Sequence, residues 1–285
     1  MTLLVILRYF TKNQIFYYIS MYIPRLLKRI IKDLLLKYNL RISRTTSYSD
    51  LLSFFSSLQP YSTNYNLIRI GSNNDGGYLI PDDLDGINAC FSPGVSDCSD
   101  FEFDLATRGI KCFLADFSVN TPPKSHKLFH FDKKFLSSIE SQNHITLNNW
   151  IDNKTPNESE FILQMDIEGS EYAVILDTSR ETLMKFRILV IEFHELDLLS
   201  DNTAFQLISL CFKKLLSDFE IIHIHPNNCA KPIVYNKYEI PPTIEFTFLR
   251  KDRILKKIAT KSFPHPLDMK NIPHKDDFNL PKIWF

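Results

Sequence analysis

The stretch from Cys90 to Phe117 constrains the fold of this chain more than any other. It starts as a short apolar run, turns at Gly94, continues as a helix-like segment at 99–108, and ends with a second apolar run at 111–115 and Asp116. This order predicts a strand, a tight turn, a helix and a parallel strand within about thirty residues. The start of the helix offers free backbone N–H groups, and an acid at the tip of the second strand can accept hydrogen bonds from ribose hydroxyls. The stretch therefore predicts a nucleoside site.

The glycine pattern of this unit disfavours a dinucleotide and favours a nucleoside without phosphates. Only Gly94 stands where the dinucleotide motif G-x-G-x-x-G needs three glycines, which disfavours close binding of a pyrophosphate. A nucleoside without phosphates, such as S-adenosylmethionine, needs fewer. We expect this cofactor to contact Gly94, Val95, Glu102 and Asp116. Two simpler alternatives stay open: Glu102 only complements the helix dipole, and Asp116 is only a solvated acid at a strand end.

The rest of the chain continues the alternation of strand and helix. Buried apolar runs predict further strands at 161–165, 188–191 and 221–224, and a final antiparallel strand at 244–249. Helices are predicted at 47–59, 170–176 and 204–216. This pattern indicates an α/β fold with a doubly wound, mostly parallel sheet.

Residues 67–80, just before the nucleoside unit, predict a β-hairpin. Two alternating apolar runs flank the sequence NNDGG at 73–77, whose residues favour a tight turn. Because the hairpin precedes the first strand of the unit, we expect Asp75 and Gly76 at its tip to lie over the cofactor.

Polar residues follow the predicted parallel strands where each strand ends. In open α/β sheets, ligands bind at this edge. Besides Asp116, the residues at these ends are Asp166 with Glu168, Glu192 with His194, and His225 with Asn228. We expect Asp166 to take part in both cofactor binding and catalysis. We expect Glu168, Glu192 and Asn228 to contact the substrate.

Histidine is well suited to activate an alcohol nucleophile near neutral pH. His194 and His225 are therefore the candidate general bases, and a hydrogen-bonded structural histidine is the alternative for each. By strand alternation we expect His223 to point to the opposite face and to be structural.

The same strand ends combine carboxylate and imidazole groups, which suit a divalent metal ion. Asp166, Glu192 and His194 form the candidate ligand set. No sequence-adjacent motif such as H-E-x-x-H supports a metal site, so we do not expect one.

The N-terminal segment has a different character. Residues 1–41 carry eight Lys and Arg residues and one acid, Asp33. Apolar residues from Ile23 to Leu35 recur at helical spacing, with the basic residues on the other face. Such a helix can lie on an anionic membrane surface or pack on protein. We therefore divide the chain into a basic amphipathic helical arm, 1–46, and a domain with an extended C-terminal tail, 47–285.

Composition bounds the partners and the compartment. The net charge of +0 gives no overall field that favours nucleic acid. The five cysteines are scattered, which favours reduced thiols in the cytoplasm. The sequence has no apolar run long enough for a membrane span, and no small-residue cleavage site follows its first residues. We therefore expect neither a membrane span nor a secretory signal. We expect a cytoplasmic protein, with peripheral contact to the inner face of the membrane through 1–41 as one option.

Four motifs resemble those of the FkbM-type methyltransferases: DGGYLIP (75–81), GVSDCSDFEFDLA (94–106), LQMDIEGSEYAVI (163–175) and EFHELD (192–197). Two later stretches, HIHPNN (223–228) and IEFTFLRKD (244–252), resemble a bacterial branch of that family. The sequence DIEGSEY at 166–172 is the most specific, and the resemblance covers 48–275.

The resemblance implies a class I, Rossmann-like methyltransferase dependent on S-adenosylmethionine. Its sheet would have seven mostly parallel strands, one antiparallel strand among them, and helices on both faces. Such enzymes commonly methylate hydroxyl groups of sugars or other small molecules, often in surface-polysaccharide biosynthesis. Carried over by motif, Gly94 would form the turn beside the cofactor, Asp116 would hold the ribose, and Asp166 would border the methionine end and the acceptor.

Two other functions remain as alternatives. An NAD-dependent nucleotide-sugar enzyme is disfavoured by the missing glycines and by the absence of a Tyr-x-x-x-Lys pair. A non-catalytic Rossmann-like binding module, tethered by the basic helix to a membrane assembly, is the third hypothesis.

Overall fold

The computed structural model describes residues 25–39 and 42–285. The chain divides into two units, 1–44 and 45–285. Within the first unit, the helix α3 spans Arg25–Lys37. Ile23, the first residue of the predicted apolar stripe, lies outside the described residues. None of the helices among the described residues is long and apolar enough to cross a membrane.

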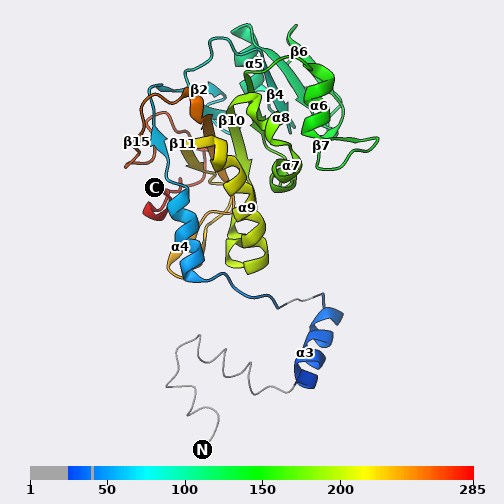
Figure 1. The fold of residues 1–285 in the computed structure, drawn as a ribbon, viewed down its shortest axis with the longest axis vertical. Helices are drawn as coiled ribbons and strands as arrows, with labels where there is room; N and C mark the ends of the chain where they lie inside the picture. Colours follow the sequence, from blue (N-terminus) through cyan, green and yellow to red (C-terminus); the bar gives the residue numbers. More distant parts are fainter. Residues whose placement is uncertain (1–24, 40–41) are drawn as a thin grey trace, which may run out of the picture. The chain divides into compact units, whose positions relative to one another are not determined.

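The second unit is built around a seven-stranded sheet (Figure 1). The strands stand in the spatial order β11-β14-β10-β9-β4-β5-β6. Strand β14 is antiparallel to both of its neighbours, whereas β10, β9, β4, β5 and β6 run parallel to one another. The predicted Rossmann-like class is therefore confirmed. The bounds are β4 Ala89–Pro93, β5 Lys111–Ala115, β6 Phe129–Asp132, β9 Phe161–Met165, β10 Phe186–Phe193, β11 Phe219–Pro226 and β14 Ile244–Arg250.

Helices cover one face of this sheet, and a helix with a hairpin covers the other. Alternate residues of each strand point to opposite faces. Phe91 accordingly joins the larger core, and its neighbour Cys90 joins the smaller one. The larger core is closed by α4 (Tyr48–Ser57), α6 (Leu147–Lys154), α7 (Glu171–Asp177), α8 (Arg180–Met184) and α9 (Asn202–Asp218). The smaller core is closed by α5 (Asp100–Thr107) and by β2 (Leu67–Gly71) paired with β3 (Gly77–Pro81).

Several short elements were not predicted from the sequence. Each pairs only two or three residues, too few to produce a periodic pattern. They are β1 (Tyr61–Ser62) with β15 (Ile258–Ala259), β7 (Phe135–Leu136) with β8 (His144–Ile145), and β12 (Ile233–Tyr235) with β13 (Tyr238–Ile240). The C-terminal tail, 262–285, contains one regular element, the 3-10 turn η3 (Lys282–Trp284).

Candidate functional site

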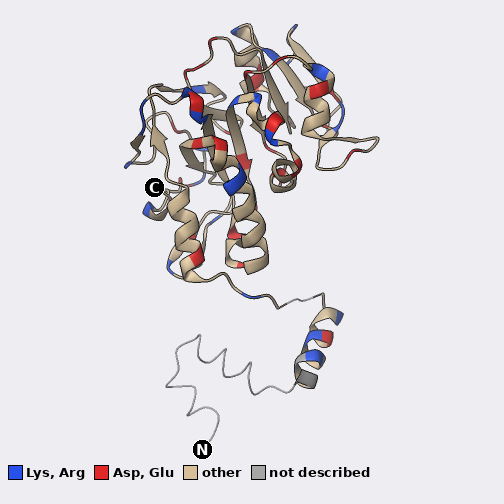
Figure 2. Cartoon of the chain, in the orientation of Figure 1, with Lys and Arg blue, Asp and Glu red and all other residues tan. Residues whose placement is uncertain are grey.

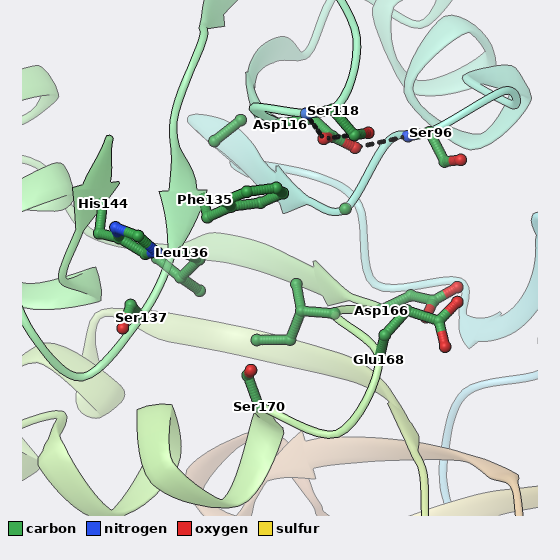
Figure 3. Close-up of a pocket in the computed structure, with 13 residues that line it drawn as sticks. Ser96, Asp116, Ser118, Phe135, Leu136, Ser137, His144, Asp166, Glu168 and Ser170 are labelled. Atoms are coloured by element: carbon green, nitrogen blue, oxygen red, sulfur yellow. Dashed lines mark hydrogen bonds between the residues drawn. The ribbon is translucent and has the colours of Figure 1, made fainter. Parts of the chain in front are cut away.

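A cavity of about 400 Å³ opens at the carboxyl ends of β4, β5 and β9 (Figure 3). Gly94 and Ser96 line it after β4, Asp116 lines it after β5, and Asp166 and Glu168 line it after β9. This is the edge of an open α/β sheet at which ligands bind. Four of the five residues were predicted from strand ends and their turns, and Ser96 was not.

Asp116 is held by the two turns that flank the cavity. Its Oδ2 accepts a hydrogen bond from the backbone N–H of Ser96 at 2.8 Å. Its Oδ1 accepts from the backbone N–H of Ser118 at 2.7 Å and from the Ser118 hydroxyl at 2.6 Å (Figure 3). The carboxylate therefore fixes the loop after β4 against the loop after β5. Oδ2, which accepts one bond, keeps room for one more donor, whereas Oδ1 already accepts two.

Gly94 allows the loop after β4 to approach Asp166, the residue that follows β9. Its φ of +89° is in the left-handed region, and a Cβ there would overlap the carbonyl oxygen of Asp166. Only glycine combines that backbone conformation with such a close approach. The turn and Asp166 are consequently packed against each other.

The wall of the cavity opposite these loops comes from β7 and β8. Phe135, Leu136 and His144 line it. The sequence did not point to these residues, because two-residue strands within an irregular stretch give no periodic signal.

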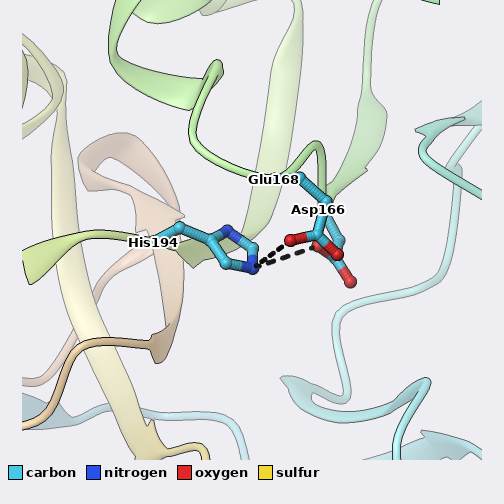
Figure 4. A group of neighbouring side chains, drawn as sticks. All are labelled: Asp166, Glu168 and His194. Carbon is cyan, nitrogen blue, oxygen red and sulfur yellow. Dashed lines mark ion pairs between the residues drawn. The ribbon is translucent and has the colours of Figure 1, made fainter. Parts of the chain in front are cut away.

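His194, which follows β10, lies at the edge of this site with its two ring nitrogens in different surroundings. Nδ1 is 3.0 Å from Oε1 of Glu171, a side chain that is 0% exposed. Nε2 lies 3.5 Å from a Glu168 oxygen and 3.7 Å from an Asp166 oxygen (Figure 4). An ionised carboxylate only accepts, so Nδ1 donates its proton to Glu171. In the neutral imidazole Nε2 is then the acceptor.

The charges around His194 shift two pKa values. Burial alone would lower the pKa of His194, but the hydrogen bond to Glu171 and the charges of Glu171, Asp166 and Glu168 outweigh it and raise that pKa. Burial, together with neighbouring acids, raises the pKa of Asp166 to about 7, against an opposing effect of His194. Protonation in this group therefore changes near neutral pH.

A second group of acids forms beside the first, on the sheet face covered by the hairpin. Asp75, Glu192 and Glu245 bring their carboxylate oxygens within 4.8 Å of one another. Asp166, Glu168 and His194 form a separate group of the same kind. Glu192, which the sequence grouped with Asp166 and His194 as a metal ligand set, thus lies in the other group.

His225 belongs to the buried interior of the domain. It is 5% exposed, and its Nδ1 lies 3.7 Å from Asp268 of the C-terminal tail. Burial opposes protonation, but Glu245 and Asp268 outweigh it and raise the pKa of His225 to about 9. His223 also contacts Asp268, at 2.8 Å, so the two histidines share a face. The expectation that His223 faces the opposite way is wrong, because residues two apart in a strand point the same way.

The remaining predicted site residues do not line the cavity. Val95 packs in the smaller core. Glu102 is 3% exposed, and its carboxyl lies within hydrogen-bond distance of the Ser92 hydroxyl. Gly76 lies at the hairpin tip with φ +75°. Asn228 donates to the carbonyl of Ile272 at 3.0 Å and accepts from its N–H at 2.8 Å, so its amide holds the tail.

The residue that the sequence missed most clearly is Glu171. Its Oε1 accepts from the N–H groups of Ile167 and Gly169 as well as facing His194. An acid in the first turn of a helix usually only complements the helix dipole or caps the helix. Its position in the sequence therefore did not predict the contact with His194. Its place within the specific motif DIEGSEY was the available signal.

The fold is of the Rossmann-like type found in methyltransferases: the antiparallel strand β14 lies between β11 and β10 near one end of the sheet, and the acid-lined cavity lies at the ends of the parallel strands. The model of the methyltransferase FkbM domain matches residues 58–214, which is more than half of the 285 residues. The chain therefore belongs to the FkbM methyltransferase family. No curated protein matches it.

Proposed function

We propose that the protein transfers a methyl group from S-adenosylmethionine to a hydroxyl group of a sugar or glycan, with His194 as the general base. The observation that carries the proposal is the orientation of His194. Glu171 holds its Nδ1, while Nε2 points toward the acids that border the cavity. A base oriented in this way is what an alcohol nucleophile needs.

The cavity suits a nucleoside cofactor. Its volume of about 400 Å³ lies within the range of small-molecule sites, and polar loops line it on one side and apolar side chains on the other. When bound, S-adenosylmethionine supplies an electrophilic methyl group on a sulfonium. Asp116 would accept a hydrogen bond from the ribose through Oδ2, and Gly94 would let the loop approach closely.

The acids at the cavity edge favour a hydroxylated acceptor. Carboxylates bind hydroxyl groups by accepting their hydrogen bonds, and Glu168 is exposed there with 87% of its side chain accessible. Nε2 of His194 would take the proton that the acceptor hydroxyl loses as its oxygen attacks the methyl carbon. Holding the two reactants in line supplies the rest of the catalysis.

The first experiment is calorimetric titration of the full chain with S-adenosylhomocysteine. We expect one site, and we expect Asp116→Ala to weaken it strongly because the ribose partner is lost. NAD is titrated in parallel. Binding of NAD in place of S-adenosylhomocysteine would contradict the proposal and favour the nucleotide-sugar enzyme.

The acceptor class is tested separately by transfer of a labelled methyl group to a panel of free and nucleotide-linked sugars. His194→Ala should keep S-adenosylhomocysteine binding but lose transfer. Transfer that stays at the wild-type rate in this variant would remove His194 as the base.

We also propose that α3 binds an anionic membrane surface. Leu27, Ile30, Ile31 and Leu34 are all exposed on one stripe of the helix. By helical periodicity, Arg29 and Lys32 fall on the opposite face. Figure 2 marks the charged residues along α3, of which Asp33 is the only acid. An apolar stripe beside a basic face complements the boundary of an anionic bilayer.

This proposal is tested by sedimentation with phosphatidylcholine vesicles with and without phosphatidylserine. Leu34→Ser on the apolar stripe should weaken binding to the anionic vesicles by about tenfold. Leu36→Ser is the matched control, because Leu36 is similarly exposed, at 52%, but falls on the basic face. Equal effects of the two substitutions would contradict an oriented helix.

A further inference from the structure

Three neighbouring strands place a row of titratable side chains on one face of the sheet. Glu192 of β10 is paired with Glu245 of β14, and Glu245 is paired with His225 of β11. Residues that are directly opposite in an antiparallel pair point to the same face. The tip of the hairpin adds Asp75 and the tail adds Asn271, whose Nδ2 donates to Asp75 at 3.1 Å and to Glu245 at 2.6 Å.

Three carboxylates at this place lack a cationic partner within ion-pair distance among the described residues: Asp75, Glu192 and Glu245. Glu192 and Glu245 are 3% and 5% exposed, and Asp75 is exposed. Across 25–39 and 42–285, no Lys, Arg or His nitrogen forms an ion pair within 4.0 Å with any of the three. Their hydrogen bonds come from the neutral amides of Asn227 and Asn271. Amide donors do not balance the charge of carboxylates removed from water.

The two cations that act on Glu245 from nearby are engaged with other groups. His225 Nδ1 faces Asp268 at 3.7 Å. Arg69 donates to the carbonyl oxygens of Ser72 and Asn74 at 2.8 and 3.0 Å. Both raise the positive potential at Glu245 without pairing with it.

Unpartnered polar atoms on deeply buried side chains mark the same place. Oε2 of Glu192 and Oδ1 of Asn271 are buried and make no hydrogen bond. These two residues are 3% and 5% exposed. Asn271 lies between Asp75 and Glu245, so a half-turn of its amide would direct the free oxygen at the space between those carboxylates. Buried polar atoms of this kind need a partner, and a bound ion or an ordered water can supply one.

We propose that Asp75, Glu192 and Glu245 bind one divalent cation, with the side-chain oxygen of Asn271 as a further ligand. All of these ligands are oxygens, which selects a hard cation such as Ca²⁺, Mg²⁺ or Mn²⁺ over Zn²⁺. Their separation of at most 4.8 Å fits one coordination shell, since ligands about 2.4 Å from Ca²⁺ lie up to about 4.8 Å apart. The exposed Asp75 provides the entry and leaves room for water ligands.

The cation would join three segments that are distant in the sequence. It would tie the hairpin tip and the C-terminal tail to the edge of the sheet, beside the acids of the candidate site. The tail already contacts the tip, through the hydrogen bond from Asp75 N–H to the Asn271 carbonyl at 3.3 Å.

Mn²⁺ titration of the full chain, followed by electron paramagnetic resonance, tests the site. We expect one Mn²⁺ per chain, and we expect Asp75→Asn and Glu245→Gln each to weaken it by at least about tenfold. Asparagine and glutamine keep the oxygen that accepts from Asn271, so these variants remove charge with little change of shape. Asp75 is exposed, so its substitution is safe for folding even if Glu245→Gln is not.

Glu168→Gln is the matched control, because Glu168 belongs to the other acidic group. Its Mn²⁺ affinity should stay within about twofold of the wild type. No saturable binding, loss in Glu168→Gln, or retained affinity in Asp75→Asn would overturn the proposal. Binding of S-adenosylhomocysteine, measured without metal on Glu245→Gln, should be unchanged, because Glu245 does not line the cavity. A failed cation site is thereby distinguished from a failed methyltransferase assignment.

Discussion

The two acidic groups at the edge of the sheet have similar charges but different partners. Asp166 and Glu168 border an open cavity and face the imidazole of His194. Glu192 and Glu245 are buried and face amides. An imidazole fixed by a carboxylate can accept and release a proton, whereas an all-oxygen group without a cationic partner can hold a metal ion or retain protons. Neighbouring positions on one scaffold thus acquire separate chemistry from the identity of the groups that face them.

The largest expected effect concerns the group that contains the histidine. His194→Ala should lower the turnover number for methyl transfer by about 10²–10⁴-fold, the usual contribution of a positioned base. Binding of S-adenosylhomocysteine should persist, because the cavity loops are intact. Single-turnover transfer of a labelled methyl group measures the first quantity, and calorimetry measures the second.

His274→Ala is the control for this experiment, since His274 is an exposed histidine of the tail. It should leave turnover unchanged. If His194→Ala retains most of its activity, the histidine group does not differ functionally from the all-oxygen group, and the comparison fails.

Glu102 is a buried acid that belongs to neither of the two acidic groups. It is 3% exposed, and burial raises its pKa to about 7, against the opposing hydrogen bond from Ser92. The Ser92 hydroxyl has one proton but lies near both the Glu102 carboxyl and Oε1 of Gln164, the latter at 2.6 Å. A protonated Glu102 that donates to Ser92, which then donates to Gln164, satisfies all three groups.

Glu102→Gln should therefore stabilise the protein at high pH. The folded-state pKa is raised, so the contribution of this carboxyl is fully present below about pH 4.5 and is lost as the pH rises to about 7. The free energy of unfolding of the variant, relative to the wild type, should be about 3 kcal/mol higher at pH 8 than at pH 4.5. Urea unfolding at both pH values measures it. If the difference in free energy of unfolding between Glu102→Gln and the wild type is the same at both pH values, the pKa of Glu102 is not raised. Burial would then not be enough to keep this carboxyl protonated near neutral pH.

The sequence predicted the sheet well, because buried strands and amphipathic helices leave periodic patterns. The predicted helix at 99–108 became Asp100–Thr107, and the predicted strand at 161–165 became Phe161–Met165. Asp116 and Asp166 were placed at the cavity by the single rule that ligands bind at strand ends.

What the sequence did not predict depends on contacts between distant segments. Asp268 faces His225 from a tail that was expected to wrap the surface, and Glu245 together with Asp268 raises the pKa of this candidate base. Glu245 was identified only as part of a strand, because its role depends on the hairpin and the tail that cover it. No local pattern encodes such contacts.

The smallest expected effect concerns Glu171, the acid that accepts a hydrogen bond from His194. It separates the effect of the negative charge of Glu171 from the effect of its hydrogen bonds. Glutamine at position 171 keeps the oxygen that accepts from His194 and from the loop N–H groups, but it removes the negative charge. Since Glu171 raises the pKa of His194, Glu171→Gln should lower that pKa. Methyl transfer rises with pH as the base loses its proton, so the midpoint of this rise should move to lower pH in the variant.

At pH values above both midpoints, the maximal rate of Glu171→Gln should be about tenfold lower, since a base with a lower pKa accepts a proton less readily. Glu181→Gln, which neutralises an exposed acid in the first turn of α8, should move neither the midpoint nor the rate. A rate loss in Glu171→Gln without a shift of the midpoint would mean that Glu171 acts only by orienting the ring. The electrostatic difference between the two acidic groups would then be irrelevant to catalysis, and geometry alone would distinguish them.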